Sequence, residues 1–390
     1  MWFMKRLMKL ESLAVLAGVA WATAAAAQPE QWLEYHTTQT AMGYRRLELT
    51  TTPPPNVALP KLNAAPYFGR WVTPMDASGG RWVCFDRTRK SGPYDRLFLD
   101  SNGNGRLDDE TPLNAARRDE YSAYFDPLRL VFKGEDGPIT YHLVLRYYQY
   151  QDSPASVLAG GGGWYEGTVN LAGKKQRVRL IDGNVNGTFN DIGSNLTGCD
   201  RIEVGEGEKA ESRYLGRLLE LDNQLFQIEV ARDGAFLKVQ EAENVVFGQV
   251  RVPETISEFA AVGEPGHFVR KQVKSELKLP VGKYSVAGWT INRKDSKGAA
   301  WTLRGYGFSE AAEFEVTAGK PAVPEIGEPV RGTLQVAEAK NSEVAFNLSF
   351  QGAGGERVEM MKGTERPRGP KLTLSSLDGS FRQTNSFEFG

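Results

Sequence analysis

The chain has 390 residues with 47 basic and 48 acidic side chains, and this balance gives no global field that would favour nucleic acid or an anionic membrane. The 41% hydrophobic and 11% aromatic content excludes a disordered chain, and the 2 Cys exclude a disulfide-dense scaffold or a Cys-rich metal site. The 3 widely spaced His argue against an all-His metal centre. The length allows two domains of ordinary size.

The first 27 residues have the pattern of a secretory signal peptide. Three basic residues precede an apolar stretch over residues 12–22, and a run of alanines ends at Ala27. This pattern predicts cleavage after Ala27 and a secreted or periplasmic protein. An uncleaved anchor helix is the alternative, but the apolar stretch is short for a bilayer of roughly 30 Å. No later apolar run reaches transmembrane length, so we expect no membrane span after signal removal.

Export sets the expectation for the two cysteines, Cys84 and Cys199. In an oxidising compartment two Cys most economically form one disulfide, which we predict here. Two buried free thiols are the alternative.

A ten-residue pattern occurs twice in the chain. Residues 100–109 (loop 1) read DSNGNGRLDD, and residues 182–191 (loop 2) read DGNVNGTFND. Positions 1, 3 and 5 bring side-chain oxygens to one point, glycine at position 6 allows a sharp turn, and position 7 offers its carbonyl. The expected calcium ligands are Asp100, Asn102, Asn104, Asp109 and the carbonyl of Arg106 in loop 1, and Asp182, Asn184, Asn186, Asp191 and the carbonyl of Thr188 in loop 2.

These loops resemble the calcium loops of EF-hand and dockerin-type proteins. They depart from that family at position 12, where Thr111 and Gly193 replace the usual bidentate acid. Glu110 is a further candidate ligand in loop 1. The neutral amides at positions 3 and 5 predict weak sites, about 10⁻⁴ to 10⁻³ M, with loop 2 the weaker because it has only two candidate carboxylates. Asn-Gly is also a common hairpin turn, so two plain turns are the alternative.

The segment Ile139–Gln151 alternates apolar and polar residues, as a half-buried strand does. Its outward row would carry His142, Arg146, Tyr148 and Tyr150. Such a row could form an aromatic platform for a flat ligand such as a glycan, or it could represent ordinary cross-strand pairing.

Two further segments precede the C-terminal region. The glycine run Gly160–Gly163 is expected to be a flexible connection and not regular structure. Residues 218–240 predict two strands with turns at Asp222-Asn223 and Asp233-Gly234. Together with the loops, these patterns predict a β-rich domain over residues 28–247.

Residues 248–390 have a different residue pattern, with prolines between short apolar runs and no helical periodicity. Eight strands are predicted there: Ser275–Leu279, Lys283–Asn292, Trp301–Tyr306, Glu313–Thr317, Gly332–Val336, Val344–Phe350, Lys371–Leu374 and Ser386–Phe389. The stretches LPVGKYSV (279–286) and FEVTAGK (314–320) resemble the carboxypeptidase regulatory-like and immunoglobulin-like accessory domains of exported proteins. This resemblance implies an antiparallel immunoglobulin-like β-sandwich and no catalytic residues.

The predicted function is a non-catalytic calcium-binding module of a mainly β protein. The combination of signal peptide, strand-borne loops and C-terminal sandwich resembles exported bacterial proteins without an assigned activity. The alternative is an extracellular carbohydrate-active enzyme or its accessory binding unit, although the chain has no G-x-S-x-G or H-E-x-x-H motif. The expected partner is a glycan or another exported protein, with no nucleic acid.

Overall fold

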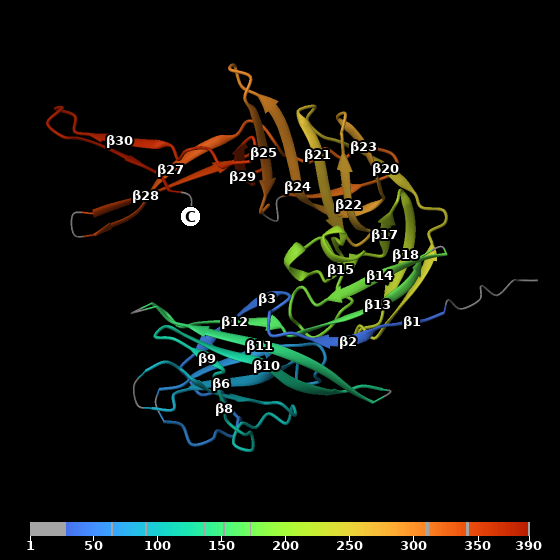
Figure 1. The fold of residues 1–390 in the computed structure, drawn as a ribbon, viewed down its shortest axis with the longest axis vertical. Coiled ribbons are helices and arrows are strands. Elements are labelled where there is room, and N and C mark those ends of the chain that lie inside the picture. The colour runs from blue at the N-terminus through green and yellow to red at the C-terminus, as the bar shows by residue number, and fades with distance from the viewer. Residues whose placement is uncertain are drawn as a thin grey trace, which may run out of the picture.

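The computed structural model describes residues 29–388 except residues 64, 90–91, 136, 151–152, 172, 309–311 and 341–342, and the side chains of 337–340 and 343. The signal peptide prediction therefore lies outside the described residues. Strands make up 54% of the structure, which contains several antiparallel sheets and, in its described part, no α-helix. The prediction of a mainly β fold is confirmed (Figure 1). No helix in the described part is long and apolar enough to cross a membrane.

The first two sheets face each other and share a core. The first contains β4 (Leu49–Thr50), β5 (Tyr67–Val72), β6 (Gly80–Asp86), β7 (Arg96–Leu99) and β8 (Leu113–Asn114). The second contains β3 (Tyr44–Leu47), β9 (Arg117–Arg118), β10 (Ser122–Lys133), β11 (Pro138–Tyr148) and β12 (Ser156–Gly161). Trp71 of β5 stacks on Tyr141 of β11, and Phe85 of β6 packs against Phe125 of β10.

A second pair of sheets follows in the chain. One contains β2 (Glu34–Thr37), β13 (Gly163–Leu171), β14 (Lys174–Ile181), β15 (Arg201–Val204) and β16 (Glu211–Tyr214). The other contains β1 (Gln31–Trp32), β17 (Leu218–Leu221), β18 (Gln224–Val230) and β19 (Phe236–Glu241). Two short 3-10 turns, Leu196–Gly198 and Gly207–Lys209, lie beside β15. All four sheets contribute to one cluster of buried side chains.

The first four strands connect these sheets at their edges. β1 pairs with β19, β2 with β13, β3 with β12, and β4 with β5. The segment from residue 31 to residue 50 therefore supplies one edge strand to each of the four sheets in turn.

The C-terminal region has its own core, built on one large sheet. That sheet contains β21 (Ile256–Gly263), β22 (Gly266–Lys271), β24 (Gly282–Lys294), β25 (Ala300–Tyr306), β26 (Glu313–Val316), β27 (Arg331–Lys340), β28 (Glu343–Gln351) and β29 (Arg357–Lys362). A small sheet of β20 (Phe247–Arg251) and β23 (Glu276–Pro280) shares its core. The hairpin of β30 (Lys371–Ser375) and β31 (Arg382–Ser386) extends away beside β27 and β28 (Figure 1).

Seven of the eight C-terminal strand predictions coincide with strands, but the last does not, because residues 382–386 form that strand instead. Strands β20, β21, β22 and β29 were not predicted. The buried residues of this region run from Val250 to Val358, and those of the N-terminal core from Leu33 to Leu237. The domain boundary at residue 247 falls between them and stays a prediction.

Two predictions for the N-terminal part need correction. The run Gly160–Gly163 is not a flexible connection: residues 160 and 161 end β12, and residue 163 begins β13. A Cβ on Gly160 would lie 2.2 Å from the Ala41 side chain, and one on Gly163 would lie 2.3 Å from the Tyr35 hydroxyl. These glycines therefore serve close packing between strands.

Residues 218–240 form three strands and not two, because both predicted turns are present and two turns separate three strands. Asp222 and Asn223 both have positive φ angles of 49° and 62°, as a type I′ hairpin turn requires.

Candidate metal centre

Loop 1 connects β7 to β8 and closes around the carboxylate of Asp100. Asp100 is 2% exposed, and its two oxygens accept hydrogen bonds from the backbone N–H groups of Gly103 (2.8 Å) and Gly105 (3.1 Å). Both glycines have positive φ angles, 77° and 74°, that let the chain turn around the carboxylate. Burial raises the pKa of Asp100 above its usual value.

The remaining loop 1 side chains extend this arrangement. Asn102 Oδ1 accepts the N–H of Asn104 (3.0 Å), and Asn104 Oδ1 accepts the N–H of Arg106 (2.8 Å). The side-chain amide of Asn104 donates to Asp109 Oδ2 (2.7 Å), so the structure brings positions 5 and 10 together. The Arg106 side chain points elsewhere and pairs with Asp108 (2.7 Å).

Loop 2 connects β14 to β15 and repeats these interactions. Asp182 is 1% exposed and accepts the N–H groups of Gly187 (2.7 Å) and Asn186 (3.2 Å). Asn186 Oδ1 accepts the N–H of Thr188 (2.8 Å), and its amide donates to Asp191 Oδ2 (2.8 Å). The same oxygen of Asp191 also accepts the amide of Asn184 (3.1 Å). Loop 2 therefore brings its predicted side chains together as loop 1 does.

The Thr188 hydroxyl has a role that the sequence did not indicate. It donates to Asn186 Oδ1 and to Asp191 Oδ2, both at 2.6 Å. The expected contribution of Thr188 was only its carbonyl, but its side chain also fixes the two neighbouring acceptors.

Position 4 differs between the loops. In loop 1 it is Gly103, and in loop 2 it is Val185 with a φ angle of 55°. A β-branched residue is strained in this left-handed region. The indole N–H of Trp71 donates to the Val185 carbonyl (2.7 Å), and the Val185 side chain is completely buried. Contacts around loop 2 therefore stabilise the left-handed conformation at Val185, which loop 1 adopts without strain because it has glycine at position 4.

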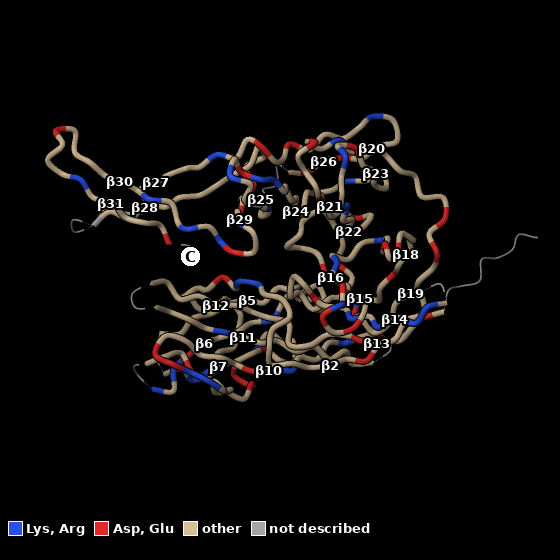
Figure 2. Tube along the Cα trace, turned by 45° about the horizontal axis from the view of Figure 1, so that its top comes forward, with Lys and Arg blue, Asp and Glu red and all other residues tan. Residues whose placement is uncertain are grey.

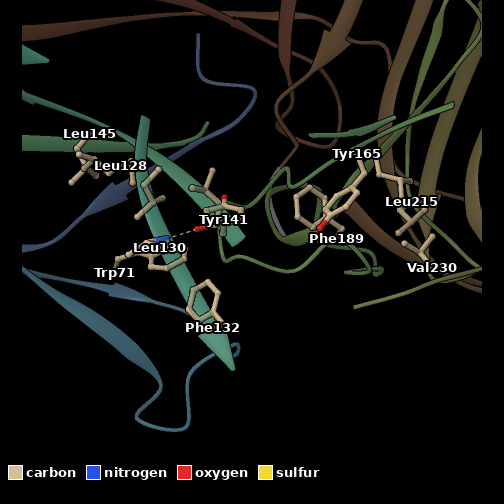
Figure 3. Close-up of a cluster of buried hydrophobic side chains, with 14 of the residues drawn as sticks. Trp71, Leu128, Leu130, Phe132, Tyr141, Leu145, Tyr165, Phe189, Leu215 and Val230 are labelled. Carbon is tan, nitrogen blue, oxygen red and sulfur yellow. Dashed lines mark hydrogen bonds between the residues drawn. The ribbon is translucent and has the colours of Figure 1, made fainter. Parts of the chain in front are cut away.

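The loops are anchored in different cores through their residue at position 8. Leu107 of loop 1 packs into a small cluster with Phe68, Cys84 and Phe98. Phe189 of loop 2 belongs to the large core, where it meets Tyr141 and Tyr165 edge-on (Figure 3).

Loop 2 joins the two pairs of sheets. Tyr141 of β11 donates its hydroxyl to Asp182 (2.9 Å), and Trp71 of β5 donates to Val185 (2.7 Å). On the other side, the N–H of Phe189 donates to the carbonyl of Arg232, between β18 and β19 (2.9 Å). Elements from both pairs of sheets thus contact the same ten residues.

The charges around the loops also differ. Beside loop 1 lies the buried guanidinium of Arg81, which donates to the Asp100 carbonyl (3.3 Å) and pairs with Asp76 (2.6 Å). Beside loop 2 lies Asp200, a completely buried acid whose oxygens accept the N–H groups of Gly183 (3.0 Å) and Asp191 (2.8 Å). A buried basic side chain in an ion pair thus lies beside loop 1, and an additional buried acid lies beside loop 2.

The two buried acids Asp182 and Asp200 both have raised pKa values. Burial raises the pKa of Asp182 to about 6. Burial first, and then the charge of Asp182, raise the pKa of Asp200 well above its usual value. Sequence reasoning missed Asp200 because it lies outside the repeated pattern, next to Cys199.

Within the described part of the chain, no three His, Cys, Asp or Glu side chains form a group that could hold a metal ion by themselves. A calcium ion in either loop would therefore need amide and backbone oxygens as well. One such oxygen is available, since Asn184 Oδ1 is buried and has no hydrogen-bond partner among the described atoms.

The predicted disulfide is wrong, because Cys84 and Cys199 are both free and buried. Cys84 lies in the cluster beneath loop 1, whereas the Cys199 thiol donates to the carbonyl of Asn195 (3.1 Å) beside loop 2. Burial raises the pKa of each thiol to about 12. The alternative of two buried free thiols is what the structure contains.

The four side chains of the predicted platform on Ile139–Gln151 do not all lie on one exposed surface. Four of the inward residues are buried and Ile139 is half-buried, and Arg146 is exposed on the outer face. The His142 ring, however, stacks on Tyr35, and the Arg146 guanidinium covers Tyr124. Tyr148 is half-buried.

Tyr150 lies beyond the end of β11 and packs against Tyr121. His142, Arg146 and Tyr150 thus each pack against a different aromatic ring, and the ligand platform stays a prediction.

Figure 2 shows charges of both signs interleaved along the described part of the chain, in keeping with the near-zero formal charge. Comparisons with protein-family models, with curated proteins and with solved structures gave no match.

Proposed function

We propose that the protein is an exported, non-catalytic binding or structural module in which calcium ions stabilise loops 1 and 2. The observation that carries this proposal is the equivalence of the loops. In each, the carboxylate at position 1 accepts the N–H of the glycine at position 6, and the amide at position 5 bridges positions 7 and 10. Isolated hairpin turns do not require the same set of hydrogen bonds across positions 1 to 10 twice.

The residues present fit a calcium ion. Asp100 and Asp109 in loop 1, and Asp182 and Asp191 in loop 2, supply hard carboxylate oxygens within a few residues of one another. Asn102, Asn104, Asn184 and Asn186 supply amide oxygens, and Arg106 and Thr188 supply the carbonyls of position 7. The buried Asn184 Oδ1 without a partner supports this set, because a buried acceptor gains most from a cation.

The charges favour loop 2 as the tighter site. The expectation that loop 2 binds more weakly depended on a count of its carboxylates, which did not include Asp200. Asp200 adds a buried acid beside loop 2, which a bound calcium ion would keep ionised despite its raised pKa, whereas the guanidinium of Arg81, paired with Asp76, lies beside loop 1. Binding would also stabilise the ionised form of Asp182, which burial disfavours.

The finer fold assignment of residues 248–390 as an immunoglobulin-like sandwich remains part of this proposal. Two sheets that enclose one core, with Leu279 of β23 and Phe259 of β21 both completely buried, support it. Such a domain is typical of exported proteins that bind or connect.

The alternative, a carbohydrate-active enzyme, has less support. The cavity beside Thr88 has a volume of about 320 Å³ and is lined by Asp95 and Asp119. Asp95 is paired with Arg118, and Asp119 accepts hydrogen bonds from Ser122. Hydrogen bonds and ion pairs thus occupy both acids, whereas a catalytic pair needs one raised and one ordinary carboxyl.

Thermal unfolding with millimolar calcium or with a chelator tests the proposal. Calcium should raise the midpoint by a few °C, since a ligand that binds only the folded state stabilises it. Asp182→Ala should remove most of this response, whereas Asp378→Ala, in the C-terminal hairpin, should leave it unchanged. Equal midpoints of the wild-type protein with calcium and with chelator would contradict the proposal.

A further inference from the structure

A groove separates the edges of two sheets that belong to different cores. Its volume is about 1510 Å³, and its walls come from β16 and the β15–β16 connection on one side and from β22 and β23 on the other. β16 is the last strand of its sheet and pairs only with β15, and β22 pairs only with β21. The groove therefore lies between two open strand edges.

One hydrogen bond closes the end of this groove. The N–H of Tyr214 in β16 donates to Nδ1 of the His267 ring in β22 (3.3 Å). The N–H of Tyr214 thus points away from β15, and every second residue of a strand points the same way. The N–H of Ser212, which lines the groove, is therefore directed into it.

The opposite edge presents main-chain groups too. β21 and β22 form a hairpin in which Gly263 faces Gly266 across a two-residue loop. In such a hairpin the pair next to the loop is hydrogen-bonded and the pattern alternates from there. The N–H and C=O groups of Val269 and Lys271, both of which line the groove, therefore point away from β21.

The groove also carries unpaired positive charge. Four of its acids are in ion pairs: Glu211 with Arg213, Glu220 with Arg270, Asp222 with Lys174, and Glu276 with Arg251. Four of its lysines have no acidic partner among the described residues: Lys209, Lys271, Lys274 and Lys278. Only Glu206 opposes them as an acid of the groove with no ion pair in the described structure. The near-neutral protein thus has a local excess of positive charge at this place.

We propose that this groove binds an extended acidic peptide segment of a partner protein, which adds as a strand between β16 and β22. The open edges supply main-chain hydrogen bonds, and the lysines select carboxylates. The apolar side chains of Val269 and Phe247 are 36% and 41% exposed in the groove, so a segment that alternates acidic and apolar residues fits it. An acidic polysaccharide could use the lysines, but it has no peptide groups spaced to match two strand edges.

The probe is an acetylated and amidated hexapeptide that alternates glutamate with valine, labelled for fluorescence anisotropy. We expect it to bind the full mature protein more tightly at low salt than at high salt. The same peptide with alternate amides N-methylated keeps its charge but cannot pair with a strand edge, and it should not bind. A hexapeptide of alternating lysine and valine should not bind either.

The variant that combines Lys271→Ala, Lys274→Ala and Lys278→Ala should bind the acidic peptide at least about tenfold more weakly. A matched variant with Lys294→Ala, Lys297→Ala and Lys320→Ala removes the same charge outside the groove, and its affinity should change less than about twofold. Equal weakening in both variants would overturn the proposal, because only net charge would then matter.

Three further results would overturn the assignment. Binding of the N-methylated peptide as tight as that of the parent would exclude strand addition. Binding of polygalacturonate, lost in the groove variant, without any binding of the peptide would assign the groove to acidic polysaccharides. Unchanged peptide affinity with new self-association of the groove variant would show that the lysines only protect the open edges from aggregation.

Discussion

Loops 1 and 2 share the sequence pattern and the hydrogen bonds that link position 1 to position 6 and position 5 to positions 7 and 10, but they lie in different surroundings. Loop 1 is at the surface of one sheet pair, with a buried arginine below it and a small apolar cluster as its anchor. Loop 2 lies between both sheet pairs, with an additional buried acid and an anchor in the main core. The comparison teaches that the ten residues of a loop determine its local geometry. The charges beside the loop and the core that anchors it come from distant parts of the chain.

The largest difference is expected for the anchoring residues. Phe189→Ala removes a ring from the main core between Tyr141 and Tyr165, and it should lower the free energy of unfolding by about 3–5 kcal/mol. Leu107→Ala opens a cavity only in the small cluster beside Phe68 and should cost about 2–3 kcal/mol. Urea unfolding of both variants measures the difference. An equal or larger cost of Leu107→Ala would remove the distinction between the loops.

The second expected difference concerns calcium affinity. Asp200→Asn removes a carboxyl group that bound calcium would keep ionised, and it should weaken calcium binding at loop 2 about tenfold, because that charge acts across a poorly solvated interior. Loop 1 is the internal control, since its affinity should not change. Calcium titrations of the Asp100→Ala variant with and without Asp200→Asn isolate loop 2. An unchanged loop 2 affinity would mean that Asp200 serves only to hold the backbone N–H groups of Gly183 and Asp191.

The smallest expected effect is on pH dependence without calcium. Burial raises the pKa of Asp182 to about 6, so the folded state binds a proton more tightly than the unfolded state, whose value is near 3.8. The resulting stability is fully present below about pH 4 and is lost as the pH rises through 6. With chelator, the protein should therefore be more stable at pH 5 than at pH 7.5 by on the order of 1 kcal/mol.

Calcium should reduce or reverse this dependence, because it binds the ionised carboxylate. Urea unfolding at both pH values, with calcium and with chelator, measures the effect. In Asp182→Asn the contribution of this group should be absent, and an identical pH dependence in that variant would assign it to other groups.

The features that could be predicted from the sequence are the turns, which depend only on residues close together in the chain. Asn and Gly at fixed positions determine the loop turns, and the pair Asp222-Asn223 forms its turn through its own φ angles. The sequence could not indicate Asp200, Tyr141 or Arg81, since no spacing within the loops connects them to Asp182 or Asp100.

The predictions for the glycine run and for the cysteines were wrong for the same reason. Gly160 and Gly163 look like a linker until Ala41 and Tyr35, more than a hundred residues away, pack against them. Cys84 and Cys199 look like a pair until the fold places them in separate clusters. In each case the tertiary neighbour and not the local composition decides the role.

The most direct test of the central claim is equilibrium dialysis of the mature protein against calcium. Wild-type protein should bind two calcium ions, and Asp100→Ala and Asp182→Ala should each bind one, with the tighter site lost in Asp182→Ala. No bound calcium in the wild-type protein, or the same binding in all three proteins, would contradict the account.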